Sequence, residues 1–170
     1  MSTVAVNKIE DLSANQNKGV LQVVSATKTT AFTTTSTSLV DVTGLTVDIT
    51  PRSADSKFLI THTAQLSNSS AGWHSFTTLI RKVSGGSDVQ IAVNTTATGH
   101  ANSTMFLESV NYHTSGVSVT HLDSPSTTSE ITYRVQGYTG GGTFCLNRRG
   151  DDASEGAVSN ITVMEIQGVI

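Results

Sequence analysis

The chain has 170 residues, of which 36% are hydrophobic and 14% are charged, and its net charge is -3 at pH 7. This length fits one domain, since single domains usually contain about 100 to 150 residues, and the hydrophobic content argues against a disordered chain. A weakly acidic chain without a Lys/Arg stripe lacks the positive surface that binds a polyanion, so we expect no nucleic-acid partner.

Cysteine usage and the N-terminal pattern bear on the compartment. Cys145 is the single cysteine, so an internal disulfide is excluded, and its neighbours Phe144 and Leu146 indicate a buried apolar residue rather than a reactive thiol. The N-terminus has no basic start before a long apolar run, and no stretch reaches the roughly 18 apolar residues that cross a bilayer. We therefore expect a protein that folds in a cytoplasm, without membrane insertion.

The first 18 residues differ from the rest of the chain. Their branched aliphatic side chains, three of which have a roughly helical spacing, are Val4, Val6, Ile9 and Leu12. A polar run ends this segment at Gly19. We predict an N-terminal attachment arm over residues 1–18, followed by a β-sandwich domain over residues 19–170.

From Val20 onward, short apolar or alternating runs are divided by turn residues, as is typical of antiparallel strands. More than a quarter of the chain is Ser or Thr, and the β-branched Thr and Val favour pleated surfaces. The strands predicted in chain order are 20–26, 29–35, 39–50, 57–67, 74–83, 89–93, 104–111, 117–122, 130–138, 143–147 and 160–167. Almost no room remains for a helix.

The alternation is clearest near the C-terminus. Ile131, Tyr133 and Val135 share one face of a strand and the polar residues between them share the other, as burial on one side requires. Turn residues such as Pro51 and the triple glycine at 140–142 separate the strands. Strand-like runs at intervals of about 10 to 15 residues, without helical segments, predict an all-β, antiparallel, jelly-roll-like β-sandwich.

No constellation of residues predicts catalysis, a metal site or a cofactor. The histidines, none of which are paired at ligand spacing, are His62, His74, His100, His113 and His121. Serine is abundant, but no Gly-x-Ser-x-Gly turn presents one as a nucleophile. A depolymerase would need two carboxylates about 5 to 10 Å apart in a cleft, and the acidic residues are scattered. We predict a non-enzymatic protein.

The tripeptide Arg149-Gly150-Asp151 matches the integrin-binding sequence of animals. Three-residue matches arise readily by chance, and a polar loop containing glycine is the simpler explanation. We keep Arg149 and Asp151 as candidate recognition residues.

Trp73, the single tryptophan, follows a polar loop at residues 67–72. If exposed, it would offer an aromatic platform for a sugar or a protein. If buried, it would fill the core at a strand start. The candidate neighbours of Trp73 are His74, His100 and Tyr112.

Four separated segments resemble parts of a known module: residues 19–45, 51–59, 121–129 and 160–166. The first runs from Gly19-Val20-Leu21-Gln22-Val23 to Val42-Thr43-Gly44-Leu45. In this order they are similar to the β-sandwich module of tail-fibre-like and virion surface proteins of marine and cyanobacterial bacteriophages. The resemblance spans about residues 19 to 167 and is weakest over 66–111. It implies a non-catalytic module of the virion surface.

We therefore expect a bacteriophage structural protein, made in the bacterial host and anchored on the virion surface by residues 1–18. Because no shaft segment precedes the module, a capsid decoration protein or short head fibre is the leading hypothesis. A receptor-binding tail fibre or tail knob that contacts the host cell is the alternative. The expected partners are other virion proteins of the capsid or tail, further copies of the chain as a homotrimer, and a host-surface glycan.

Overall fold

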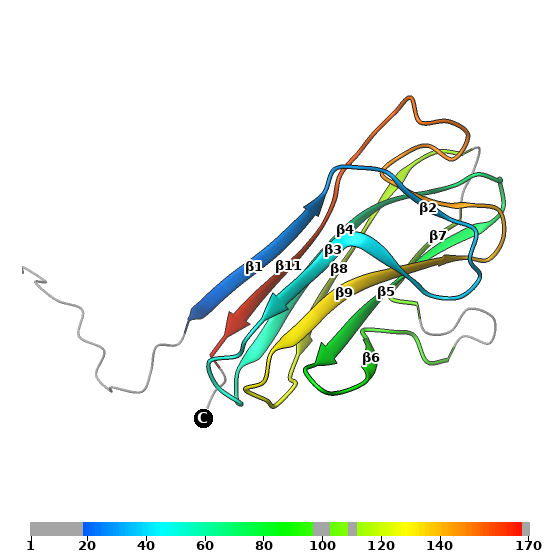
Figure 1. The fold of residues 1–170 in the computed structure, drawn as a ribbon. Helices are drawn as coiled ribbons and strands as arrows, with labels where there is room; N and C mark the ends of the chain where they lie inside the picture. The colour runs from blue at the N-terminus through cyan, green and yellow to red at the C-terminus, as the bar shows by residue number, and fades with distance from the viewer. Residues whose placement is uncertain (1–18, 97–102, 109–111, 168–170) are drawn as a thin grey trace, which may run out of the picture.

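The computed structural model describes residues 19–96, 103–108 and 112–167, which form a sandwich of two antiparallel sheets (Figure 1). No helix occurs in these described ranges, and the predicted fold class is confirmed. The predicted attachment arm, with Val4, Val6, Ile9 and Leu12, lies outside the described residues, as does His100.

The two sheets divide the strands as follows. Sheet A contains β1 (Val20–Lys28), β2 (Phe32–Thr34), β4 (Lys57–Asn68), β8 (Ser115–Asp123), β10 (Phe144–Leu146) and β11 (Ser159–Ile166). Sheet B contains β3 (Val40–Ile49), β5 (His74–Val83), β6 (Asp88–Ile91), β7 (Met105–Glu108) and β9 (Ile131–Thr139).

The strand pairing has jelly-roll topology. β1 pairs with β11, β3 with β9, β4 with β8, and β5 with both β6 and β7. Each pair joins strands closer to the middle of the chain than the pair before it, which is the nesting of a long antiparallel hairpin wrapped into two sheets. β6 and β7 pair with different halves of β5 and together act as one interrupted strand. β2 and β10 are short additions beside the end of β4.

The core lies between the sheets and follows the predicted alternation. Ile131, Tyr133 and Val135 of sheet B are at most 1% exposed, and they face Phe58 and Ile60 of sheet A, which are fully buried. Each fully buried side chain of this size contributes about 1.5 to 3 kcal/mol to stability. One-sided burial in β4 and β9 leaves much of both outer faces for solvent or partners, whereas β5 is buried on both of its faces from Ser75 to Ile80.

The sandwich has two distinct ends. At the end that we call the entry end, Val20 begins β1 beside Ile166, the last residue of β11. The opposite end, which we call the loop end, carries the loops at 69–73, 112–114, 140–143 and 147–158. β4 runs between the two ends, and its length corresponds to about 35 Å at about 3.3 Å per residue. Figure 1 shows β1 and β11 side by side, with the long β10–β11 loop far from the start of β1.

Candidate recognition surface at the loop end

The loop end is assembled from segments that are far apart in the sequence. Ser69 N donates to Thr143 O (3.0 Å), which joins the β4–β5 loop to the β9–β10 loop. Gly150 N donates to Tyr112 O (3.1 Å), which joins the β10–β11 loop to the segment before β8. The segments that carry Trp73, Tyr112 and Arg149, singled out in the sequence as separate candidates, are thus brought to one end of the molecule.

Trp73 rests on one face and is open on the other. Its exposed fraction is 47%. A Cβ added at Gly141 would lie 2.5 Å from atoms of the indole ring, so the ring packs directly on the glycine backbone. Trp73 is therefore a supported, half-exposed aromatic platform rather than a core residue.

An aromatic cluster lies on the outer face of sheet B and begins at His74, the residue after Trp73. The His74 ring stacks on Phe76, with ring centroids 5.7 Å apart, and lies 6.1 Å from Phe106. Phe76 in turn stacks on Tyr138 at 4.6 Å. Phe106 is 59% exposed, so an apolar ring faces solvent with aromatic support behind it.

Phe106 is not among the residues predicted from the sequence, although a signal for it exists. Met105, Phe106 and Leu107 are three consecutive apolar residues in a strand, and alternation forces one of them away from the core. Met105 is buried and Phe106 is the residue that points outward.

The buried side chain of Asn68 forms hydrogen bonds that hold these loops together. Its Oδ1 accepts a hydrogen bond from Ser70 N (3.0 Å). Its Nδ2 donates to Thr139 Oγ1 (3.0 Å), Gly141 O (3.0 Å) and Ser75 Oγ (3.3 Å). Asn68 is fully buried, and these bonds tie the loop before Trp73 to the loop on which its ring rests.

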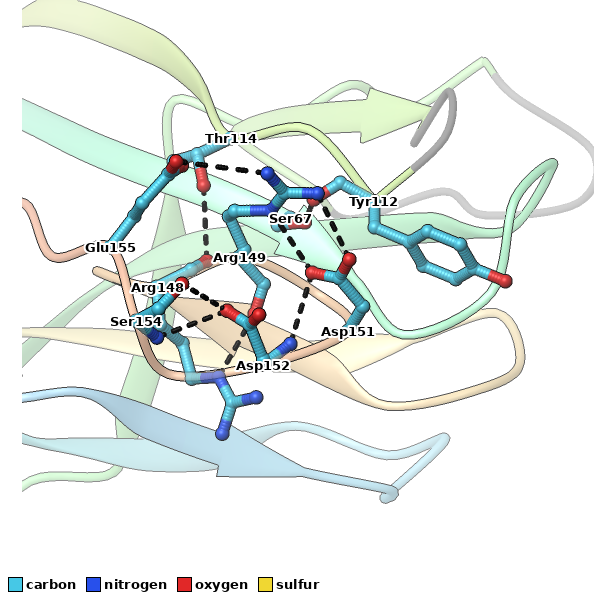
Figure 2. A network of polar contacts seen from close by, with 9 residues as sticks. All are labelled: Ser67, Tyr112, Thr114, Arg148, Arg149, Asp151, Asp152, Ser154 and Glu155. Atoms are coloured by element: carbon cyan, nitrogen blue, oxygen red, sulfur yellow. Dashed lines mark hydrogen bonds and ion pairs between the residues drawn. The ribbon is translucent and has the colours of Figure 1, made fainter.

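Arg149 and Asp151 are closed on each other rather than free to bind a partner. Arg149 Nε donates to Asp151 Oδ1 (3.0 Å) and Arg149 Nη2 donates to Oδ2 (2.9 Å), as Figure 2 shows. Nη1 of Arg149 also lies 3.7 Å from Glu155 Oε1. The hydrogen bond from Arg149 holds the pKa of the Asp151 carboxyl below its ordinary value. A partner that binds both charges of the tripeptide must first break this pair.

Gly150, between them, is anchored against β4. A Cβ at Gly150 would lie 1.8 Å from the Asn68 carbonyl oxygen, so the loop backbone passes directly over the end of β4. The Tyr112 ring points away from this network in Figure 2 and is 37% exposed. The Arg149 loop thus covers the outer side of sheet A at the loop end, and Tyr112 adds a further exposed ring there.

The buried carboxylates hold structural contacts. Asp123 accepts hydrogen bonds from Arg81 Nη1 (2.7 Å) and the Tyr133 hydroxyl (2.8 Å). Glu165 accepts from the Gln22 side chain and from the Arg52 backbone N–H. Strand register places the fully buried Phe58 between them. They therefore do not face each other across an open cleft, as glycoside hydrolysis requires.

Residues 19–96, 103–108 and 112–167 offer neither a metal site nor a membrane-spanning helix. These residues contain no group of three or more His, Cys, Asp or Glu placed to hold a metal ion. They also contain no helix long and apolar enough to cross a membrane.

Comparison with known proteins gives only distant structural likeness. No family model and no curated protein sequence matches the chain. A structure of T=1 particles derived from infectious bursal disease virus aligns with a TM-score of 0.47 and 10% identity, covering 98% of this chain and 45% of that chain. The VP2 subviral particle of this virus aligns with a TM-score of 0.42 and 14% identity, covering 86% and 41%. The chain spans less than half the length of these viral chains, and TM-scores below 0.5 carry no functional assignment.

Proposed function

We propose that the chain is a non-enzymatic structural protein of a bacteriophage virion. Residues 1–18 attach it to the particle, and the jelly roll presents its loop end outward as a capsid decoration protein or short head fibre. The resemblance of residues 19–167 to phage virion modules supports the class of protein.

The observation that carries this proposal is the polarity of the sandwich. The chain enters β1 at Val20, beside Ile166, at the entry end. The half-exposed Trp73 and the Arg149 loop lie at the other end of β4, about 35 Å away at about 3.3 Å per residue. An attachment at one end therefore leaves the opposite loops free to face outward.

Deleting residues 1–18 tests the proposal. In phage lacking the gene and complemented with the variant, we expect about tenfold less protein per purified particle, because the attachment contacts are lost. The isolated deletion variant should keep the melting temperature of the full chain, since the core lies within residues 19–167. Quantitative immunoblotting of particles measures incorporation.

Two further variants sharpen this experiment. The triple variant Val4→Ser, Ile9→Ser and Leu12→Ser keeps the length of the segment and removes three of its apolar side chains. It should therefore also lower incorporation. Arg149→Ala, at the opposite end, is the matched control and should be incorporated normally. Unchanged incorporation of the deletion variant would contradict the proposal.

A receptor-binding tail knob is the second candidate function, and the exposed aromatic side chains favour it. Trp73, Phe106 and Tyr112 are 47%, 59% and 37% exposed, and such rings recognise sugars and proteins.

Trp73→Ala separates the two functions. For a decoration protein we expect the variant phage to adsorb to host cells as the wild type does. We also expect gold-labelled antibodies against the protein to bind the capsid in electron micrographs. About a tenfold loss of adsorption, with label at the tail, would instead establish the tail knob. Val89→Ala, which removes a comparably exposed side chain on β6, is the control.

A further inference from the structure

The outer face of sheet A carries a row of apolar side chains that crosses four strands. Strand register aligns Val23 of β1 with Met164 of β11, Leu59 of β4 and Leu122 of β8. They alternate with core residues such as Phe58, so they point away from sheet B. Val23 is 53% exposed and Leu122 is 55% exposed. The row is thus an uncovered apolar band in the described structure.

Beyond this row, toward the loop end, the face is covered by hydroxyl and amide groups. The next row in register is Ser25, Thr162, Thr61 and Thr120. The row after it is Thr27, Asn160, Thr63 and Ser118. On the other side of the apolar row, Val20 and Ile166 lie beside Lys57. Lys57 is the single ionisable side chain among these outward positions.

The outer face of sheet B is built differently. Arg134 forms ion pairs there with Asp41 and Asp88, and Thr132 donates to Asp48. A surface that stays in water usually carries charges at about a quarter to a third of its positions. The outer face of sheet B therefore carries charged groups beside the aromatic cluster around Phe106, whereas the outward rows of sheet A named above carry one charge, at Lys57, and have the composition of a face that becomes covered.

The chemistry of the sheet A face fits a second copy of the same chain. A hydroxyl both donates and accepts hydrogen bonds, so a hydroxyl row can pair with a copy of itself, which a row of like charges cannot. An apolar row is likewise complementary to its own copy. A contact in which the same surface faces itself is the usual geometry of a two-fold dimer.

The size of the face approaches that of a standard interface. Four strands about 4.8 Å apart, with outward positions about 6.8 Å apart along each strand, give a face of roughly 19 by 27 Å. A standard stable interface buries about 800 Å² of accessible surface on each partner, and a pleated face of these dimensions, with its side chains, supplies an area of that order.

We propose that the outer face of sheet A is a homomeric interface, on which a second copy of the chain packs its own sheet A. The two apolar rows lie against each other at the centre of the contact, and the Ser/Thr rows form its hydrogen-bonding part. The inference goes beyond the proposed function, because it concerns contacts between copies of the chain. It can be tested on purified protein without any particle.

The test introduces charge where the copies meet. Val23→Lys and Leu122→Lys replace side chains that are already more than half exposed, so the monomer should keep its melting temperature. Four lysines then face each other across the contact, and repulsion of this kind costs several kcal/mol. We expect the wild type to be a dimer by light scattering and the double variant to dissociate at least about 100-fold more readily.

The control is Val89→Lys, an exposed apolar residue of β6 in sheet B, which should remain dimeric. A wild type that stays monomeric at every soluble concentration overturns the proposal. So does an assembly of any size, including a trimer, whose mass is unchanged in the folded double variant, since its contacts then lie on another surface.

Discussion

Asn68→Ala is expected to lower the free energy of unfolding by about 3 to 5 kcal/mol. The substitution removes the acceptor of Ser70 N and the donor to Thr139 Oγ1, Gly141 O and Ser75 Oγ, and each lost hydrogen bond costs about 0.5 to 1.5 kcal/mol. Thr139 Oγ1 and Gly141 keep their hydrogen bonds to each other, whereas Ser70 N loses its acceptor. Each buried polar group without a partner costs about 1 to 3 kcal/mol. Urea unfolding followed by circular dichroism measures the loss, and fluorescence of the single Trp73 reports the loop end separately.

The matched control for this substitution is Asn94→Ala. Asn94 is exposed and caps its own turn, where its Oδ1 accepts from Thr96 N (2.8 Å) and Thr96 Oγ1 (3.1 Å). A comparable loss of local hydrogen bonds in contact with water should cost no more than about 1 kcal/mol. Equal losses in the two variants would show that Asn68 has no special part in holding the loop end.

The strands could be predicted because their signal is local. Each predicted range overlaps one observed strand, and in β9 the burial of Ile131, Tyr133 and Val135 follows directly from alternation. The strand predicted at 29–35 is shorter, Phe32–Thr34, while β1 extends to Lys28. The cause is a long-range contact, since Asn147 Nδ2 donates to the carbonyls of Lys28 (2.8 Å) and Thr30 (3.3 Å) and holds the chain in a bend between the strands.

The loop end could be predicted only as separate loops. The hydrogen bond from Asn68 to Thr139 joins residues 71 positions apart, and no periodic pattern in a single sequence predicts such a contact. The apolar row of sheet A could not be predicted for the same reason, because Val23, Leu59 and Leu122 align only once strand register is known. Roles for the loops and for residues 1–18 remain predictions.

His62 is a buried histidine whose protonation the fold opposes. It lies on the inward face of β4 between Ile60 and Ala64, an alternation visible in the sequence, and it is fully buried. Its Nδ1 donates to Asn160 O (2.7 Å), and its Nε2 has no hydrogen-bond partner among the described residues. Burial lowers the pKa of His62 from 6.5 to about 4, although the bond to the Asn160 carbonyl acts in the opposite direction.

Acidification from pH 6.5 to pH 4 is therefore expected to remove about 3 kcal/mol of stability through His62. Below pH 6.5 the unfolded chain binds a proton at this histidine, while the folded chain does not until about pH 4. The unfolded state thus holds more protons in this window, so stability falls as the pH falls. Urea unfolding at pH 7 and at pH 4 measures the difference.

His62→Gln isolates this contribution, because an amide can still donate to the Asn160 carbonyl but does not titrate. The variant should lose about 3 kcal/mol less than the wild type between pH 7 and pH 4, whatever its stability at pH 7. His113→Gln, at an exposed position before β8, should keep the full pH dependence. If all three proteins lose the same stability, His62 is not the group that titrates.

The Asp41 carboxylate does not imitate this signature. The hydrogen bonds that Gln136 and Arg134 donate to the Asp41 carboxyl lower its pKa below the ordinary 3.8, although burial acts in the opposite direction. The stability that these hydrogen bonds contribute is present above pH 3.8 and is lost only as the pH falls toward the lowered pKa. The window between pH 4 and pH 6.5 therefore belongs to the group whose pKa falls across it, and among these two groups only His62 meets that condition.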